Sequence, residues 1–271
     1  ILSPPAPIQI NSFKQYIKTL PQWQRTLISN YEESTNTQSF AEAIQMKQKF
    51  IIASDGSKSK STSGGAWLIA NMKGESFIEG TNPDFGHISQ IHSHRAEIYG
   101  VLSVFIFIKA YSTYFMLPFL SAIEYHGDNL EIVHKINILA TDPNYFDELH
   151  KTTDHDAVLQ LKICFPKEII AFHVKSHQDM RKKQEHLTLP ERLNIKVDQL
   201  IGNKARAPLN THILQTALAI YVNGKYIPNN YINSIRTACG EKDAKAFLMR
   251  KYQWTTATIE DIEWELQAKY I

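Results

Sequence analysis

Four carboxylates lie inside or beside apolar segments of this chain, and they limit how those segments can be buried. They are Asp55 in IIASDGS, Glu97 in SHRAEIYG, Asp128 in EYHGDNLEIV and Asp198 in NIKVDQLIGNKA. A carboxylate beside a buried segment is costly unless a partner compensates its charge. Four converging carboxylates would repel one another, and divalent cations such as Mg²⁺ or Mn²⁺ are the usual compensation. The pattern therefore predicts a metal site for phosphodiester chemistry.

The composition allows one sizeable core but indicates no partner. The chain has 271 residues, of which 43% are hydrophobic, and a net charge of only +2. Binding to nucleic acid therefore cannot be argued from net charge, and any basic surface must be local. The two cysteines, Cys164 and Cys239, fit no zinc or redox spacing. We expect reduced thiols and an intracellular location, in the cytoplasm or the nucleus.

Two features bear on processing and on membranes. The chain begins at Ile1 rather than Met, which favours a piece of a longer polypeptide, and its start does not resemble a secretory signal. The segment 98–120 is apolar enough to raise the question of a membrane span. Lys109 and Pro118 argue against one, so we expect a helix buried against a sheet and no membrane partner.

The order of apolar patterns predicts an α/β domain between two extensions. We expect an N-terminal connector over 1–47, a catalytic domain over 48–207 and a mostly helical extension over 208–271. Alternation and turn signals predict five strands, over 49–54, 65–71, 75–80, 121–126 and 168–174. Helical spacing predicts four helices in the same domain, over 92–111, 129–139, 157–164 and from about residue 188. This order builds a five-stranded mixed sheet with helices on both faces.

Local signals within this plan predict turns and caps. Asp55-Gly56 is expected to form the turn after the first strand, and Asp154 or Asp156 to cap the third helix. Thr188 and Glu191 have the spacing of a capping box. In the N-terminal part, we expect a helix over 13–29 interrupted at a proline and a polar linker over 31–39.

Five motifs in this order resemble the ribonuclease H family. They are SDGS at Asp55, HRAE at Glu97, GDN at Asp128, HVKSH at His177 and NIKVD at Asp198. Each is unspecific alone, but each falls on the expected element, and the resemblance covers about residues 48–207. The chain looks most like the ribonuclease H domain of a retrotransposon or reverse-transcriptase polyprotein. The resemblance implies an endonuclease that cuts the RNA strand of an RNA/DNA hybrid.

The resemblance also implies roles for these side chains around two Mg²⁺ ions, with Mn²⁺ as a possible substitute. Asp55 would bridge both ions, Glu97 and Asp128 would complete one site, and Asp198 the other. His177 would act near the attacking water or in product release. The alternatives are turn residues, surface charges and a structural histidine.

Contacts to the hybrid are expected from polar groups near the site and from a basic cluster. Twenty residues, Gln178 to Val197, separate His177 from Asp198, which is more than the compact family pattern has. This insert is either a solvated loop or a basic finger on the phosphate backbone. The expected substrate contacts are Ser57, Ser93, His94, Arg95, Arg181, Lys182 and Lys183, of which Arg95 could equally be structural.

Two other functions compete with the nuclease. A non-catalytic scaffold of the same fold could bind nucleic acid or a polymerase partner, such as an adjoining reverse transcriptase domain. Such scaffolds usually lack one or more of the carboxylates, whereas all four are present here. Another nuclease or a strand-transfer enzyme on this fold would more often carry Glu at the position of Asp198.

Overall fold

A computed structural model describes two compact units of this chain, residues 1–216 and 217–271, which are treated separately below. Within them, the structure describes residues 11–34, 39–58, 62–84, 92–117, 121–142, 154–166, 168–204, 221–222, 225–226, 231–253 and 255–256. The sequence also predicts a loop over 140–153 and turns at 223–224 and 228–230. A helix continues to Thr141, so the loop begins later than predicted, and residues 143–153 and both turns lie outside the described residues.

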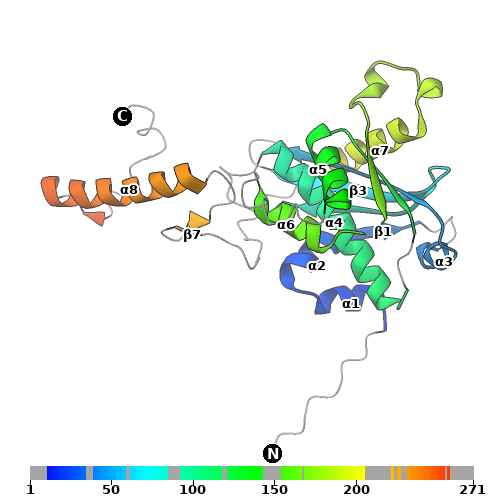
Figure 1. The fold of residues 1–271 in the computed structure, drawn as a ribbon, viewed down its shortest axis with the longest axis horizontal. Coiled ribbons are helices and arrows are strands. Elements are labelled where there is room, and N and C mark those ends of the chain that lie inside the picture. The colour runs from blue at the N-terminus through cyan, green and yellow to red at the C-terminus, as the bar shows by residue number, and fades with distance from the viewer. Residues whose placement is uncertain are drawn as a thin grey trace, which may run out of the picture. The chain divides into compact units, whose positions relative to one another are not determined.

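The first unit is built on a mixed six-stranded sheet (Figure 1). The strands are β1 (Asn30–Glu33), β2 (Phe50–Lys58), β3 (Ser63–Asn71), β4 (Ser76–Pro83), β5 (Ile123–Gly127) and β6 (Ile169–His173). Their order across the sheet is β1-β4-β3-β2-β5-β6. The pairs among β1 to β4 are antiparallel, whereas β5 pairs in parallel with both β2 and β6. The predicted α/β class with a mixed sheet is therefore confirmed, with six strands in place of the five predicted.

The additional strand comes from the segment that the sequence predicted to be a polar linker. β1 pairs with β4 and buries one side chain, Tyr31, among exposed neighbours. One apolar residue in a four-residue strand gives too short an alternation to be recognised. The strand forms because β4 offers it an unpaired edge.

Helices cover both faces of the sheet, but unequally. Phe50 and Ile52 of β2 face the larger layer, whereas Ile51 and Ala53 face the smaller one, because successive side chains alternate. The larger layer contains α1 (Phe13–Thr19), α2 (Gln22–Ile28), α3 (Phe40–Gln45), α4 (Ser93–Tyr114), α5 (Leu130–Thr141) and α6 (His155–Ile163). The smaller layer is α7 (Leu189–Lys204), which packs through Leu193, Val197 and Ile201.

Helix α4 is the central element of the larger layer. Among the described residues it is the one helix that is long and apolar enough to cross a membrane, and 83% of its apolar window is buried in the protein. This burial agrees with the expectation of a core helix.

The described part of the N-terminal segment packs into the same core. Phe13, Leu27 and Phe40 are each at most 5% exposed, and the Phe40 ring lies against Phe50 and Tyr111. α1 and α2 lie on either side of Pro21, as the predicted interruption requires, and Ser39 closes a capping box at α3. α3 lies at the end of β2 that is remote from Asp55, where Phe40 meets Phe50.

In the second unit, the described residues form a short hairpin and one helix. β7 (Tyr221–Val222) pairs with β8 (Lys225–Tyr226), on either side of the expected turn, and α8 spans Tyr231–Tyr252. The largely helical pattern predicted for this part is visible in α8.

Candidate metal centre

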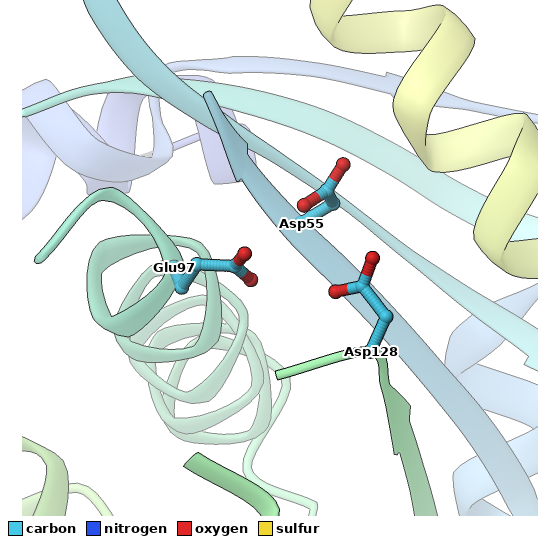
Figure 2. A group of neighbouring side chains, drawn as sticks. All are labelled: Asp55, Glu97 and Asp128. Carbon is cyan, nitrogen blue, oxygen red and sulfur yellow. The ribbon is translucent and has the colours of Figure 1, made fainter. Parts of the chain in front are cut away.

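Three of the four predicted carboxylates meet at one point. Asp55 comes from β2, Glu97 from α4, and Asp128 directly follows β5. Each offers an oxygen, and these oxygens all lie within 4.8 Å of one another. Figure 2 shows the three side chains pointing toward one another from the strand, the helix and the end of β5. β2 and β5 are adjacent and parallel, so their carboxyl ends bring Asp55 and Asp128 to the same part of the sheet.

Asp55 lies within a strand, so the predicted turn at Asp55-Gly56 is wrong. β2 continues to Lys58 and stays paired with β3, where Asp55 faces Ala66 and Gly56 faces Gly65. The glycine serves close packing instead: a Cβ at Gly56 would lie 2.2 Å from the backbone nitrogen of Glu97. Glycine inside a strand pattern is a known signal of close backbone approach, and it could have indicated this contact.

A second glycine, on the helix, completes this approach. A Cβ at Gly100 would lie 3.1 Å from the carbonyl oxygen of Asp55. Together Gly56 and Gly100 allow α4 to lie directly on β2. The carboxylate of Glu97 reaches Asp55 because of this close packing.

The three carboxylates carry an uncompensated charge. Burial, followed by repulsion from Asp128, raises the pKa of Asp55 to about 7. Burial, followed by repulsion from Asp55 and Asp128, raises the pKa of Glu97 to about 10. Burial also raises the pKa of Asp128. Within the described residues, no lysine or arginine lies at ion-pair distance from these three groups.

The donor set fits a hard divalent cation. All three groups offer oxygen, which Mg²⁺ and Mn²⁺ prefer, and a cation would relieve the repulsion that raises their pKa values. Among the described residues, Oδ1 of Asp128 is also a buried oxygen without a hydrogen-bond partner. A buried acceptor of this kind requires an ion, a water molecule or a proton.

Asp198 and His177 lie at the edge of this cluster. Asp198 projects from α7, His177 follows β6, and their side chains are 55% and 69% exposed. Oδ2 of Asp198 lies 4.0 Å from Nδ1 of His177. Asp198 contributes to the raised pKa of both Asp55 and Asp128, whereas His177 lowers that of Asp128. Asp198 is thus near the cluster, although it is not one of the three carboxylates whose oxygens converge.

His173, the first residue of the HVKSH motif, also contacts the cluster region. Its Nε2 lies 3.0 Å from the backbone oxygen of Asp128. The ring therefore holds the chain at the end of β5, where the Asp128 side chain begins. The contact joins neighbouring strands, and no local pattern indicates it.

The predicted substrate contacts near the cluster differ in exposure. Ser57 is partly exposed two residues beyond Asp55 on β2, and Ser93 is exposed at the first position of α4. His94 is largely enclosed, with its Nε2 3.1 Å from Nζ of Lys135 and 3.4 Å from Glu131. Burial lowers the pKa of His94.

Arg95 does not lie at the surface, so its predicted substrate contact is contradicted. Its side chain is fully buried, and its guanidinium donates to Asp154 at 2.8 Å and to both oxygens of Asp156 at 2.9 and 2.7 Å. The same two aspartates were predicted to cap α6, but neither does so: Asp154 occupies the N-cap position without a side-chain cap bond. The ion pairs explain why, since both carboxylates point at Arg95.

The predicted basic cluster lies in an ordered insert. Residues 178–180 and 184–186 form short 3-10 turns, and Arg181 and Lys183 are exposed between them. Lys182 instead pairs with Glu191 of α7 at 2.6 Å. Glu191 also accepts from the backbone N–H of Thr188 at 2.8 Å, which is one half of the predicted capping box.

Comparisons with known proteins are sparse. No family model matches the sequence, and no curated protein matches it. Solved structures with a similar fold include LC11-RNase H1 in complex with an RNA/DNA hybrid, at 14% identity and a TM-score of 0.34, covering 50% of this chain and 91% of that one. RNase H1 from the archaeon Halobacterium salinarum matches at 14% identity and a TM-score of 0.33, covering 49% and 90%.

A third structure contains the N-terminal RNase H domain of a Mycobacterium tuberculosis protein, fused to maltose-binding protein. It is 15% identical with a TM-score of 0.31, covering 56% of this chain and 97% of that one. Similarity at these values does not establish what this chain does. The chemistry of the carboxylate cluster has to support any function by itself.

Proposed function

We propose that this protein is a metal-dependent endonuclease that hydrolyses the RNA strand of RNA/DNA hybrids. The observation that carries the proposal is the convergence of Asp55, Glu97 and Asp128, whose oxygens lie within 4.8 Å of one another without a cationic partner among the described residues. Structural carboxylates are normally paired, so an unpaired buried group of three favours a functional site. Two-metal hydrolysis of phosphodiesters requires this kind of oxygen donor set.

The proposed roles follow from where each side chain lies. Asp55, at the centre, would hold both cations, with Glu97 and Asp128 completing one site and Asp198 approaching the other. When bound, the cations supply Lewis acidity for the attacking water and the leaving oxygen. The side chain of His177 is 69% exposed beside Asp198, where it would meet a water or a product phosphate. The products would be a 5′-phosphate and a 3′-hydroxyl.

The substrate would be held at the cluster and along the insert. Ser57, two residues beyond Asp55, and Ser93, one turn before Glu97, would offer hydroxyls to the substrate, and His94 next to Ser93 would add a further contact. Arg181 and Lys183 are exposed and would contact phosphates, whereas Lys182 braces the insert through Glu191. We place this activity in a retroelement polyprotein, next to a reverse transcriptase domain, on the strength of the sequence motifs.

The test is a cleavage assay with a hybrid labelled on its RNA strand, in Mg²⁺, Mn²⁺ or EDTA. The wild-type chain should cut the RNA strand only with metal, and Asp128→Asn should not cut. Asp179→Asn is the matched control, because Asp179 is an exposed aspartate in the insert, and it should retain activity. Saturable hybrid binding without cleavage in either metal would instead indicate the non-catalytic scaffold.

A further inference from the structure

The first turn of α4, which carries Glu97, is held from two directions. On one side it lies on β2 at Gly56, where no side chain fits. On the other side Arg95 binds the start of α6. We call the residues His92, Arg95, Asp154 and Asp156 the α4 clamp.

The α4 clamp is fully removed from solvent at its centre. The side chains of Arg95, Asp154 and Asp156 are all 0% exposed. Nη1 of Arg95 donates to Asp154 and Asp156, and Nη2 donates to Asp156 at 2.7 Å and to the hydroxyl of Tyr99 at 2.9 Å. Paired donation from a planar guanidinium fixes orientation as well as distance.

His92 connects the clamp to the backbone of the helix. As the N-cap of α4, its Nδ1 accepts a hydrogen bond from the backbone N–H of Arg95 at 3.3 Å. Its Nε2 lies 3.3 Å from Oδ2 of Asp154. Arg95 is therefore held by its side chain and by its backbone, two residues before Glu97.

The backbone of Asp154 adopts a conformation that its surrounding contacts have to hold in place. Its φ is 55°, in the left-handed region that residues other than glycine rarely occupy. Such conformations persist where surrounding contacts hold them. The Arg95–Asp154 pair supplies that contact, so the start of α6 and the start of α4 are fixed together.

We propose that the α4 clamp positions Glu97 in the metal centre, with Arg95 as the positioning residue. The inference rests on the proposed metal chemistry of the cluster, but it concerns residues that do not touch the cluster. Residues that orient metal ligands typically change metal affinity or activity by about 10- to 100-fold when replaced. If the ion pairs of Arg95 only stabilised the fold, replacing Arg95 would lower the stability of the protein and leave its metal affinity unchanged.

The test compares Arg95→Lys, which keeps the charge and loses the paired donation, with Ile44→Ala. Ile44 is a buried residue of α3, and α3 packs at the end of β2 and α4 that is remote from Asp55 and Glu97. Mn²⁺ affinity is measured by calorimetry and amide exchange by mass spectrometry over residues 93–100. We expect Arg95→Lys to weaken Mn²⁺ binding about tenfold or more and to expose the amides of the first turn of α4.

Ile44→Ala should lower the melting temperature without weakening Mn²⁺ binding and without exposing the amides of the first turn of α4. Cleavage kinetics should show a lower kcat for Arg95→Lys, with the KM for hybrid unchanged. Excess Mn²⁺ should restore part of the lost kcat in Arg95→Lys. It should not restore the kcat of Glu97→Gln, because that variant lacks the ligand itself. Unchanged Mn²⁺ affinity and unchanged exchange in a folded Arg95→Lys protein would overturn the inference, as would equal losses in Ile44→Ala.

These outcomes are distinct from failure of the nuclease proposal. A wild-type chain that binds Mn²⁺ but cuts no hybrid overturns the nuclease and leaves the clamp to be judged by Mn²⁺ affinity. If the wild-type chain binds no Mn²⁺, local amide exchange decides the clamp: a selective loss of protection over 93–100 supports it, and its absence overturns it.

Discussion

Two buried acidic groups lie on either side of the same helical turn, and they differ in compensation. In the α4 clamp, Asp154 and Asp156 face the guanidinium of Arg95 at hydrogen-bond distance. In the metal centre, Asp55 and Glu97 face each other and Asp128, and burial with repulsion raises the pKa of Glu97 to about 10. Removing one partner of a buried ion pair is destabilising, whereas a group of carboxylates without a cation lowers the stability of the fold until a cation binds. One turn of α4 therefore contributes Arg95 to a buried ion-pair network and Glu97 to the candidate metal centre.

Removing a clamp carboxylate should have the largest effect on stability. Asp156→Ala would remove the acceptor of two hydrogen bonds of the buried guanidinium and leave Arg95 with Asp154 and the Tyr99 hydroxyl. Breaking a buried ion pair costs up to about 3–5 kcal/mol. Urea denaturation should therefore show a strong loss of unfolding free energy. The contrasting variant is Asp55→Asn, which we expect to unfold at the same or a higher urea concentration in EDTA. A loss of stability in Asp55→Asn as large as in Asp156→Ala would contradict the comparison.

Metal binding should compensate the centre and leave the clamp unaffected. At a metal concentration 100-fold above Kd, a single site stabilises the folded state by about 2.7 kcal/mol. Thermal denaturation with and without Mn²⁺ should show this stabilisation in the wild-type chain and in Asp179→Asn. The shift should be absent in Asp55→Asn. An equal shift in all three proteins would place the cation elsewhere.

The packing that joins the two regions can be tested at Gly56. In Gly56→Ala the new Cβ would lie 2.2 Å from the nitrogen of Glu97, so α4 must move away from β2. Overpacking of this kind typically costs about 1–3 kcal/mol. We expect this loss in urea denaturation together with weaker Mn²⁺ binding, since Glu97 moves with the helix. A variant as stable as wild type with full Mn²⁺ affinity would show that the close approach is dispensable.

The stability of the metal-free protein should also depend on pH. The folded-state pKa of Asp55, about 7, and that of Glu97, about 10, both exceed the unfolded values, so the folded state binds more protons. In EDTA, stability should therefore fall as pH rises from 5 to 8. Glu97→Gln should flatten this trend, because one titrating group and its repulsion of Asp55 are removed. Melting temperatures at pH 5, 6.5 and 8 measure it, and Asp179→Asn should keep the wild-type trend.

Much of the sheet was predictable because its signals are local. Alternating side chains and turn residues placed β3, β4, β5 and β6 close to their observed bounds, and the apolar spacing of α4 indicated a core helix. β1 was not predictable, because it forms only where β4 offers an edge, and Tyr31 is its single buried side chain. The turn predicted at Asp55-Gly56 failed for a related reason. Glycine there allows a close contact with the backbone of Glu97, and the sequence can signal a close approach but not which distant segment makes it.

The sequence by itself determined which carboxylates lie at the ends of buried segments, since apolar runs and polar breaks are local properties. It therefore predicted Asp55, Glu97, Asp128 and Asp198 as one group, of which the first three converge. Only the tertiary structure decided which acidic residues pair with a basic side chain. Asp154 and Asp156 contact Arg95, about 60 residues away, whereas the three carboxylates of the candidate metal centre face one another. The sequence pattern cannot distinguish the two cases, because charge compensation depends on which distant segments pack together.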